Sequence, residues 1–281
     1  MNEPIGIIGL GLLGAAIAER LNKAGHQLYG FDPRRPEGRP VEICPDASLV
    51  FAKCSRVVLS LPTSCDSAAV VDEVESALRP GQVILDTTTG APEEMVGLAE
   101  RLQARDVHYL EANVAGSSVL LRDGEAALFI GGEETIATEL MPLLADLTNG
   151  AHYLGPVGTA SRFKLVHNLI LGLNRAVLAE GLQFAEALGF EGSKALSVLR
   201  QTAAASVAMK TKGERMTERR YDPPQARLKQ HLKDVRLMLD EAERSGAKTP
   251  LTALHRELLE HTEELGFGEA DNSAIIEAFN R

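Results

Sequence analysis

Apolar and polar residues alternate in two different rhythms along the chain, and the change between them falls near residue 158. Before it, short β-branched runs alternate with stretches that have apolar residues at helical spacing, which predicts crossover units and a mainly parallel sheet. The expected strands span residues 5–8, 27–31, 56–61, 82–86, 107–113 and 126–130. The expected helices span residues 12–24, 67–78, 92–105 and 134–147.

After Gly158 every pattern is helical. Residues 159–188 contain no proline, and their apolar residues recur at helical intervals, so we expect one unusually long helix. These apolar residues are Phe163, Val166, Ile170, Val177, Phe184 and Leu188. Further helical patterns span residues 192–219, 224–245, 250–265 and 273–279. The sequence therefore predicts an α/β domain over residues 1–157, followed by an all-helical domain over residues 158–281 that begins with the long helix.

The composition favours a small molecule as the partner of this chain. Of the 281 residues, 44% are hydrophobic and 24% are charged, which is enough to form a substantial core. The formal net charge of -10 opposes general binding to nucleic acid or to an anionic membrane. No apolar run reaches the roughly 18 residues of a membrane span. Cys44, Cys54 and Cys65 lack the paired spacing of a zinc or redox site, so we interpret them as reduced thiols of a cytoplasmic protein.

A glycine pattern follows the first expected strand directly. Gly9, Gly11 and Gly14 form a GxGxxG sequence at the start of an expected helix, which is the arrangement that binds a dinucleotide. The first glycine permits a tight turn, the second lets the backbone approach a pyrophosphate, and the third allows close helix packing. We therefore expect residues 1–157 to form a Rossmann-like, NAD(P)-binding domain. The expected cofactor contacts in this turn are Gly9, Leu10, Gly11, Leu12, Leu13 and Gly14.

Asp32 ends the second expected strand and stands 23 positions beyond Gly9, close to the spacing of about 20 expected for a ribose-binding carboxylate. A carboxylate there accepts hydrogen bonds from the ribose hydroxyls and repels a 2′-phosphate, which favours NAD over NADP. Arg34 and Arg35 act in the opposite direction, because a nearby arginine compensates the charge of that phosphate. We expect NAD as the cofactor, with NADP as the alternative.

Several separated motifs, in a fixed order, carry a resemblance over nearly the whole chain. They are GLGLLGAAIAERLNKAG at 9–25, Leu61-Pro62, DTTTGAP at 86–92, EANVAGSSVLLRDGEAALFIGG at 111–132, GPVGTASRFKLVHN at 155–168, Leu232-Lys233-Asp234, and GEADNSA at 268–274. With these motifs the chain resembles the β-hydroxyacid dehydrogenase family. That family includes 3-hydroxyisobutyrate dehydrogenase, tartronate semialdehyde reductase and 6-phosphogluconate dehydrogenase. The resemblance implies hydride transfer between a nicotinamide cofactor and the β-hydroxyl carbon of a small hydroxy acid or its semialdehyde.

Lys164 and Asn168 lie four positions apart near the start of the expected long helix, with His167 between them, so all three project toward one side. A lysine on the otherwise apolar face of residues 163–166 is either desolvated or directed into a cleft, and either environment lowers its pKa. The resemblance implies that Lys164 is the catalytic proton carrier and that Asn168 orients the reacting oxygen. His167 is either a core residue or a neighbour of the site, and we assign it no proton transfer.

The resemblance places residues 111–117 beside the substrate carboxylate. The family typically ends this segment in Ser-Gly-Gly, whereas this chain has Ala115, Gly116 and Ser117. The backbone amides around Gly116 and Ser117 suit an anion. The Ser117 hydroxyl either replaces part of what Ala115 cannot donate or only completes a turn. The departure affects the choice of substrate more than the type of reaction.

The resemblance also assigns residues to the cofactor side of the site. It implies that Thr89 approaches the nicotinamide and that Leu61 and Pro62 flank the cofactor. It further implies that Lys233 reaches the cofactor from the helical domain. The alternative is that Lys233 is an exposed residue of the helical face that also carries Lys229.

The 6-phosphogluconate branch shares the Lys-x-x-His-Asn sequence and has a glutamate seven positions after the lysine. Here that position is Leu171, which cannot donate a proton. We therefore expect a small substrate, similar to 3-hydroxyisobutyrate, to be oxidised without decarboxylation. The scheme requires no metal, and the sequence contains no metal-ligand cluster.

Two other functions are compatible with the same glycine pattern. An imine or pyrroline-carboxylate reductase also has a helical second domain, but Lys164 with Asn168 argues against it. A non-catalytic NAD(P)-binding interaction protein is the second alternative, and the intact lysine argues against it as well. The family resemblance implies a homodimer or homotetramer built through the helical domains.

Overall fold

The computed structural model describes residues 3–34 and 37–280, so Arg35 lies outside the described residues. The chain divides into two compact units, residues 1–164 and residues 165–281. The first unit is an α/β structure with a mostly parallel sheet, and the second is helical. This architecture confirms the predicted fold class.

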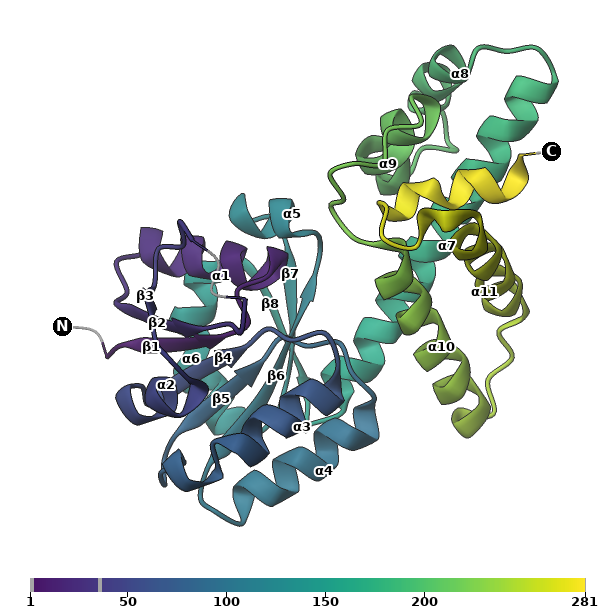
Figure 1. Ribbon diagram of the computed structural model, residues 1–281. Coiled ribbons are helices and arrows are strands. Elements are labelled where there is room, and N and C mark those ends of the chain that lie inside the picture. The colour runs from purple at the N-terminus through teal and green to yellow at the C-terminus, as the bar shows by residue number, and fades with distance from the viewer. Residues whose placement is uncertain (1–2, 35–36, 281) are drawn as a thin grey trace. The chain divides into compact units, whose positions relative to one another are not determined.

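One sheet of eight strands forms the centre of the first unit, in the order β3-β2-β1-β4-β5-β6-β7-β8 (Figure 1). Every neighbouring pair is parallel except β6 with β7. The strands are β1 Ile5–Ile8, β2 Leu28–Phe31, β3 Glu42–Ile43, β4 Arg56–Leu59, β5 Val83–Asp86, β6 His108–Ala115, β7 Ala127–Gly131 and β8 Gly150–Gly155. Because consecutive parallel strands need crossovers, helices fall on both faces of the sheet.

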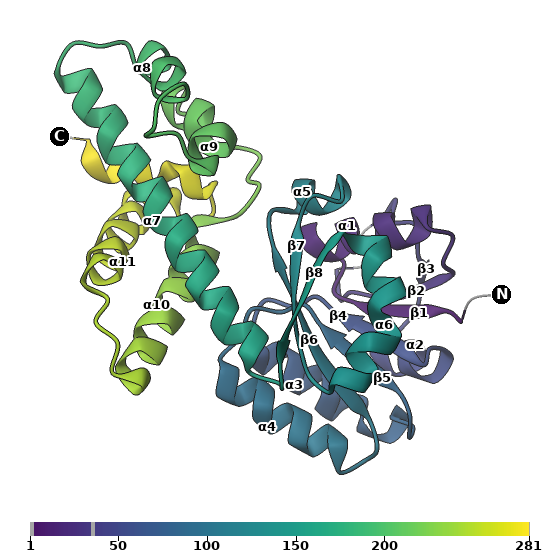
Figure 2. The same cartoon turned by 180° about the vertical axis from the view of Figure 1, so that it is seen from behind.

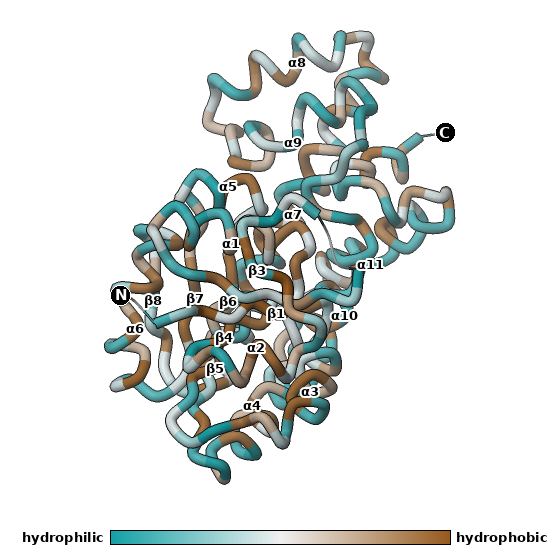
Figure 3. Tube along the Cα trace, turned by 60° about the vertical axis from the view of Figure 1, so that its left-hand side comes forward, coloured by the Kyte–Doolittle hydropathy of each residue, from teal (hydrophilic) through white to brown (hydrophobic). Residues whose placement is uncertain are grey.

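The helices of this unit are α1 Leu12–Lys23, α2 Ala47–Lys53, α3 Ser64–Glu73, α4 Pro92–Gln103, α5 Ser118–Arg122 and α6 Glu134–Leu147, with a 3-10 turn at Glu75–Ala77. One apolar core joins α1, α5 and α6 to one face of the sheet, and a second core joins α2, α3 and α4 to the other face. Figures 1 and 2 show α4 and α6 on these opposite faces. The strands between them are mostly hydrophobic in Figure 3, as expected for strands buried on both faces.

The second unit consists of the long helix α7 Thr159–Ala187, which begins in the first unit, and the helices packed along it. These are α8 Gly192–Leu199, α9 Val207–Thr217, α10 Leu228–Ser245, α11 Pro250–Thr262, a π-helical turn Glu263–Phe267 and a 3-10 segment Asn272–Phe279. The single pattern expected over residues 192–219 is therefore two helices. The second helix starts anew at Ser206, whose side chain accepts a hydrogen bond from the Met209 amide.

The apolar residues that predicted α7 do not face the core. Val166, Ile170, Val177, Phe184 and Leu188 are all more than half exposed, and Val177 is 68% exposed. The buried side of the helix instead carries residues such as Leu178 and Leu182, which belong to the core of the helical unit. The helix is thus apolar on two sides, and the outward side forms a continuous stripe.

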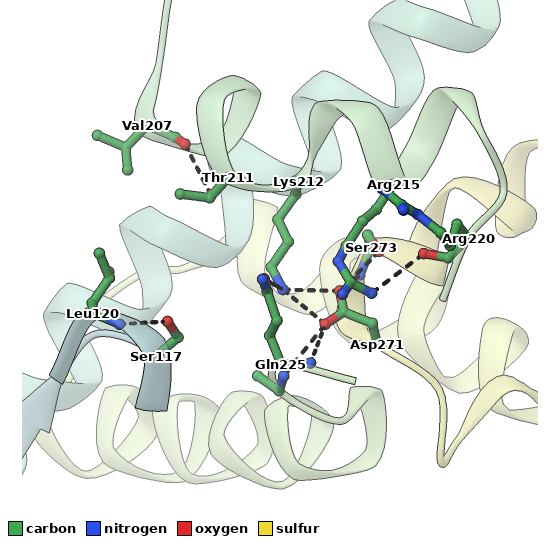
Figure 4. Close-up of polar contacts among 11 residues, drawn as sticks. Ser117, Leu120, Val207, Thr211, Lys212, Arg215, Arg220, Gln225, Asp271 and Ser273 are labelled. Atoms are coloured by element: carbon green, nitrogen blue, oxygen red, sulfur yellow. Dashed lines mark hydrogen bonds and ion pairs between the residues drawn. The ribbon is translucent and has the colours of Figure 1, made fainter. Parts of the chain in front are cut away.

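A buried ion pair joins three segments of the helical unit (Figure 4). The Lys212 ammonium on α9 donates to both carboxylate oxygens of Asp271, at 2.9 and 2.8 Å. Asp271 also accepts hydrogen bonds from the backbone amides of Gln225 and Ser273. Burial lowers the pKa of Lys212 to about 8 although Asp271 opposes the shift. Lys212 in turn holds the pKa of Asp271 below its usual value, against the effect of burial.

Across residues 3–34 and 37–280, no helix is both long enough and apolar enough to cross a lipid bilayer.

Replacing Lys212 by methionine should destabilise the protein by about 3–5 kcal/mol, because it leaves the buried Asp271 carboxylate without its cation. Denaturant unfolding followed by circular dichroism measures the change. The matched control is Arg236→Met, which removes the cation of an exposed pair with Glu260 and should alter stability little. Equal effects of the two substitutions would contradict this account of the helical unit.

Candidate active site

The glycine-rich turn after β1 has the close backbone contacts that its sequence predicts. Gly9 has a φ of 91°, and a Cβ on it would lie 2.3 Å from the Ser60 carbonyl oxygen. A Cβ on Gly14 would lie 1.9 Å from the Gly9 carbonyl oxygen. At Gly11, by contrast, none of the described atoms beyond its chain neighbours lies within 4 Å of the Cβ position. The turn is therefore closed toward the protein at two glycines and open at the third.

Gly11 is also the N-cap of α1, and it has no side chain to bond the first amides of that helix. These amides carry the positive end of the helix dipole and suit a phosphate group. Leu10 is buried, whereas Leu12 is 45% exposed beside the turn. The turn fits the pyrophosphate of a dinucleotide.

Asp32 follows β2 and holds two backbone segments together. Its Oδ2 accepts a hydrogen bond from the Leu10 amide at 2.8 Å, and its Oδ1 accepts one from the Arg34 amide at 2.9 Å. The side chain is only 7% exposed. The carboxylate predicted to bind the ribose therefore also fixes the glycine-rich turn.

Thr88, in the loop after β5, connects the loop after β4, helix α3 and strand β6. Its hydroxyl oxygen accepts hydrogen bonds from the Leu61 amide and the Ser67 hydroxyl, both at 3.2 Å. Its carbonyl oxygen accepts one from the Asn113 side chain at 2.7 Å. This network positions the adjacent Thr89, which is half-buried. Pro62 lies exposed beside Leu61 in the same loop.

Asp86 is a fully buried carboxylate beneath this network. It accepts hydrogen bonds from the Thr88 amide at 2.8 Å and from the Tyr109 hydroxyl at 2.9 Å. Burial raises the pKa of Asp86, and these donors partly offset the shift. Burial together with the nearby Asp86 also raises the pKa of Tyr109. Asp86, Thr88 and Asn113 have no role predicted from the sequence, because Asp86 meets Tyr109, and Thr88 meets Leu61 and Asn113, only across distant parts of the chain.

The segment predicted to hold the substrate carboxylate is the end of β6. Gly116 has a φ of 155°, and Ser117 is the N-cap of the short helix α5. The Ser117 hydroxyl oxygen accepts a hydrogen bond from the Leu120 amide at 3.2 Å (Figure 4). This contact forms the turn that is the alternative role of Ser117. The hydroxyl hydrogen can still donate elsewhere.

Lys164 and Asn168 both lie on α7, one helical turn apart, and both are buried, with exposures of 6% and 8%. The Asn168 amide nitrogen donates to Asp234 on α10 at 3.0 Å. Its amide oxygen lies 3.0 Å from the His167 ring nitrogen Nδ1. Asp234 thus fixes the amide of Asn168, and His167 is a neighbour of that amide.

Lys233, the predicted cofactor residue of the helical unit, forms an ion pair of 3.2 Å with Asp234 and is 25% exposed. The glycine-rich turn, Asp32, the Thr88 network and residues 115–117 belong to the first unit. These segments follow β1, β2, β5 and β6, which run in the same direction, so they lie at the carboxyl end of the sheet. The assignment of Lys233 to the cofactor stays a prediction. Among the described residues, no group of three or more His, Cys, Asp or Glu is arranged to hold a metal ion.

Comparison with known proteins identifies the family. Residues 4–155 match the NAD binding domain of 6-phosphogluconate dehydrogenase. Residues 158–279 match the domain described as NAD-binding of NADP-dependent 3-hydroxyisobutyrate dehydrogenase. The chain belongs to the β-hydroxyacid dehydrogenase family of the 3-hydroxyisobutyrate dehydrogenase type, whose members are NAD(P)-dependent dehydrogenases and semialdehyde reductases of small hydroxy acids. The resemblance predicted from the sequence is confirmed.

Curated relatives span several functions. The chain is 27% identical to glyoxylate/succinic semialdehyde reductase 1 of Arabidopsis thaliana, over 98% of this chain and 97% of that protein. It is also 27% identical to 2-(hydroxymethyl)glutarate dehydrogenase of Eubacterium barkeri, over 99% and 95%. It is 26% identical to human cytokine-like nuclear factor N-PAC, over 99% of this chain and 52% of that protein.

Solved structures share the fold. The 3-hydroxyisobutyrate dehydrogenase of Salmonella typhimurium has a TM-score of 0.90 at 23% identity, over 99% of this chain and 100% of that chain. The Mycobacterium tuberculosis enzyme with L-serine has a TM-score of 0.87 at 22% identity, with 100% of both chains covered. An imine reductase from Pseudomonas sp. has a TM-score of 0.66 at 21% identity, over 99% and 100%.

Proposed function

We propose that the protein is an oxidoreductase that transfers a hydride between a nicotinamide cofactor and the β-hydroxyl carbon of a small hydroxy acid. The observation that carries the proposal is the buried Lys164, one turn from the buried Asn168 on α7. Burying an ammonium group costs free energy, and such a cost is typical of a functional position. The open phosphate-binding turn at Gly11 supplies the cofactor half of the proposal.

Each residue has a distinct part in the proposed reaction. When bound, NAD(P) accepts the hydride in oxidation and supplies it in reduction. Lys164 as a neutral amine takes the hydroxyl proton during oxidation, and as an ammonium group it returns that proton to the carbonyl oxygen during reduction. Asn168 orients the reacting oxygen, while Gly116 and Ser117 hold the carboxylate. Fixing both ends of the substrate aligns the reacting carbon with the cofactor.

The proposed substrate is a small unphosphorylated acid that keeps its carboxylate. Leu171 occupies the position of the glutamate that serves as an acid in the 6-phosphogluconate branch, and it cannot protonate an intermediate left by carbon dioxide. The names of the relatives, which include a semialdehyde reductase and a hydroxymethyl acid dehydrogenase, support this substrate class.

We further propose that two copies of the chain associate through the exposed side of α7. The exposed residues Val166, Ile170, Val177 and Phe184 follow spacings of four and seven, which is the repeat of a helix that packs on a second helix. Gly181 lies within this stripe, where none of the described atoms beyond its own helix lies within 4 Å of the Cβ position. The α7 helix of a second copy fits this stripe, because it carries apolar residues at the same spacing.

The test of the reaction is a substrate panel. Serine, glycerate, 3-hydroxyisobutyrate, 4-hydroxybutyrate, threonate and 6-phosphogluconate are each incubated with NAD or NADP, and NADH, NADPH and carbon dioxide are measured. We expect at least one small acid to be oxidised without release of carbon dioxide. Lys164→Ala should retain cofactor affinity and lose at least about 10²-fold in turnover, as expected when a positioned acid-base group is removed.

Other outcomes of the panel would point to the alternatives. A cyclic imine is incubated with NADH or NADPH beside the panel, and its reduction in the absence of turnover of any hydroxy acid would identify an imine reductase. Tight cofactor binding without any turnover would indicate a non-catalytic binding protein. Near-normal turnover of Lys164→Ala would remove the assignment of this lysine.

For the cofactor, we predict that the protein prefers NAD and that Asp32→Asn lowers this preference. The substitution removes the charge that opposes a 2′-phosphate. It also places an amide group against the backbone amides of Leu10 or Arg34, so NAD affinity should fall as well. Catalytic efficiencies with NAD and NADP measure both effects. A wild-type preference for NADP would show that Asp32 does not govern the choice.

For the association, we predict that Val177→Asp converts the oligomer to monomers at micromolar concentration. A charge in the centre of the apolar stripe would have to be buried without a partner. Analytical ultracentrifugation measures the mass. The matched control is Val198→Asp on α8, an exposed apolar residue outside the stripe, which should leave the oligomer intact. A monomeric wild-type protein would refute this part of the proposal.

A further inference from the structure

Glu111 on β6 is a fully buried carboxylate whose four hydrogen bonds all lead to the start of α7. Its Oε2 accepts from the Gly158 amide at 2.8 Å and from the Ala160 amide at 3.2 Å. Its Oε1 accepts from the Ser161 amide at 3.3 Å and from the Ser161 hydroxyl. The carboxylate therefore binds the amides that a helix leaves unpaired at its N-terminus.

The surrounding backbone leaves room for this contact. Glu111 pairs with Gly131 on the neighbouring strand β7. A Cβ on Gly131 would lie 2.4 Å from the Glu111 carboxylate and 3.2 Å from Ala160. A side chain at this position would separate the carboxylate from the helix, so the bare glycine permits their approach.

Electrostatics makes the contact strong and specific. A negative charge at a helix N-terminus is stabilised by the helix dipole, and charge-assisted hydrogen bonds exceed neutral ones in strength. Burial raises the pKa of Glu111, and the donors from Ser161, Gly158 and Ala160 oppose that shift. A buried carboxylate of this kind tolerates little displacement of its donors.

The contact fixes Lys164 because the lysine follows Ser161 by one helical turn. The same strand β6 leads directly into Gly116 and Ser117, the proposed carboxylate site. Asn113, two positions after Glu111 and hence on the same side of the strand, binds the Thr88 carbonyl of the loop that carries Thr89. One strand thus connects the three segments that the reaction requires.

We propose that Glu111 is a positioning residue: by holding the first turn of α7 against β6, it sets the place of Lys164 relative to Gly116 and Ser117. The inference rests on the proposed function. It assigns Glu111 no contact with substrate or cofactor.

The test compares Glu111→Gln and Glu111→Asp with the wild type. The glutamine side chain keeps the size but has one acceptor oxygen, and its amide group opposes the backbone donors. We expect Glu111→Gln to lose about 10- to 100-fold in kcat, the effect of misplacing a catalytic group by about 1 Å. Cofactor affinity should stay within about twofold, because the interactions of the glycine-rich turn are unchanged. Glu111→Asp, which retains the charge, should recover part of kcat.

The matched control is Asp46→Asn at the N-cap of α2. This carboxylate accepts a hydrogen bond from the Leu49 amide at 2.8 Å, and the substitution makes the same change at a helix that carries no proposed site residue. It should change stability little, because asparagine caps a helix nearly as well as aspartate, and it should leave kcat unchanged. If Glu111→Gln keeps its kcat, or if Asp46→Asn lowers kcat by as much as Glu111→Gln does, the positioning role is refuted.

Amide hydrogen exchange separates this inference from the proposed reaction. We expect Glu111→Gln to accelerate exchange in residues 158–164, whereas Asp46→Asn leaves that segment unchanged. Unchanged exchange in Glu111→Gln would overturn the inference even if the wild-type enzyme is active. Accelerated exchange together with an inactive wild-type enzyme would refute the proposed reaction and keep only the structural link between Glu111 and α7.

Discussion

The hydrogen bonds between the Glu111 carboxylate and the first turn of α7 are the constraint on which the candidate site depends. A helix of 29 residues requires a defined start, because any rotation at its N-terminus moves every side chain along it. The Glu111 carboxylate binds the first turn of the helix. Glu111 itself lies on β6, which is hydrogen-bonded to a strand on each side. The sheet therefore holds the first turn of α7, which is followed by Lys164, the proposed proton carrier.

The sequence was sufficient to predict the fold class, because the glycine-rich turn, the strand rhythm and the change after Gly158 are local signals. The short elements β3, α2, α5 and β8 were not predicted. Strand β3 has only two residues, and β8 contains no fully buried residue, so neither has a clear apolar pattern. Periodicity also could not tell which side of α7 faces the core, since the helix is apolar on both.

The candidate site was predictable only in part. Its proposed chemical groups, Lys164, Asn168 and Asp32, stand in recognisable local patterns. The groups that hold them do not, since Glu111 meets Ala160 of α7 across 49 positions of sequence and Asn113 meets Thr88 across 25. Such contacts cannot be predicted from the spacing of residues in the sequence, because they form only when distant segments pack together in the fold. A buried acid within a β-strand is nevertheless a signal, since it requires partners wherever they lie in the chain.

The position of Ala115 decides how the proposed substrate carboxylate is recognised. The methyl side chain donates no hydrogen bond, and the Ser117 oxygen already accepts one from the Leu120 amide. What remains at this end of β6 is the hydroxyl hydrogen of Ser117 and the backbone amides around Gly116. A polar site rejects a wrong ligand when that ligand leaves the buried donors of the site without a hydrogen-bond partner. A site with few side-chain donors therefore discriminates weakly among carboxylates of similar size. If the proposed function holds, selection among hydroxy acids depends on the substituent at the α-carbon and on residues outside this segment.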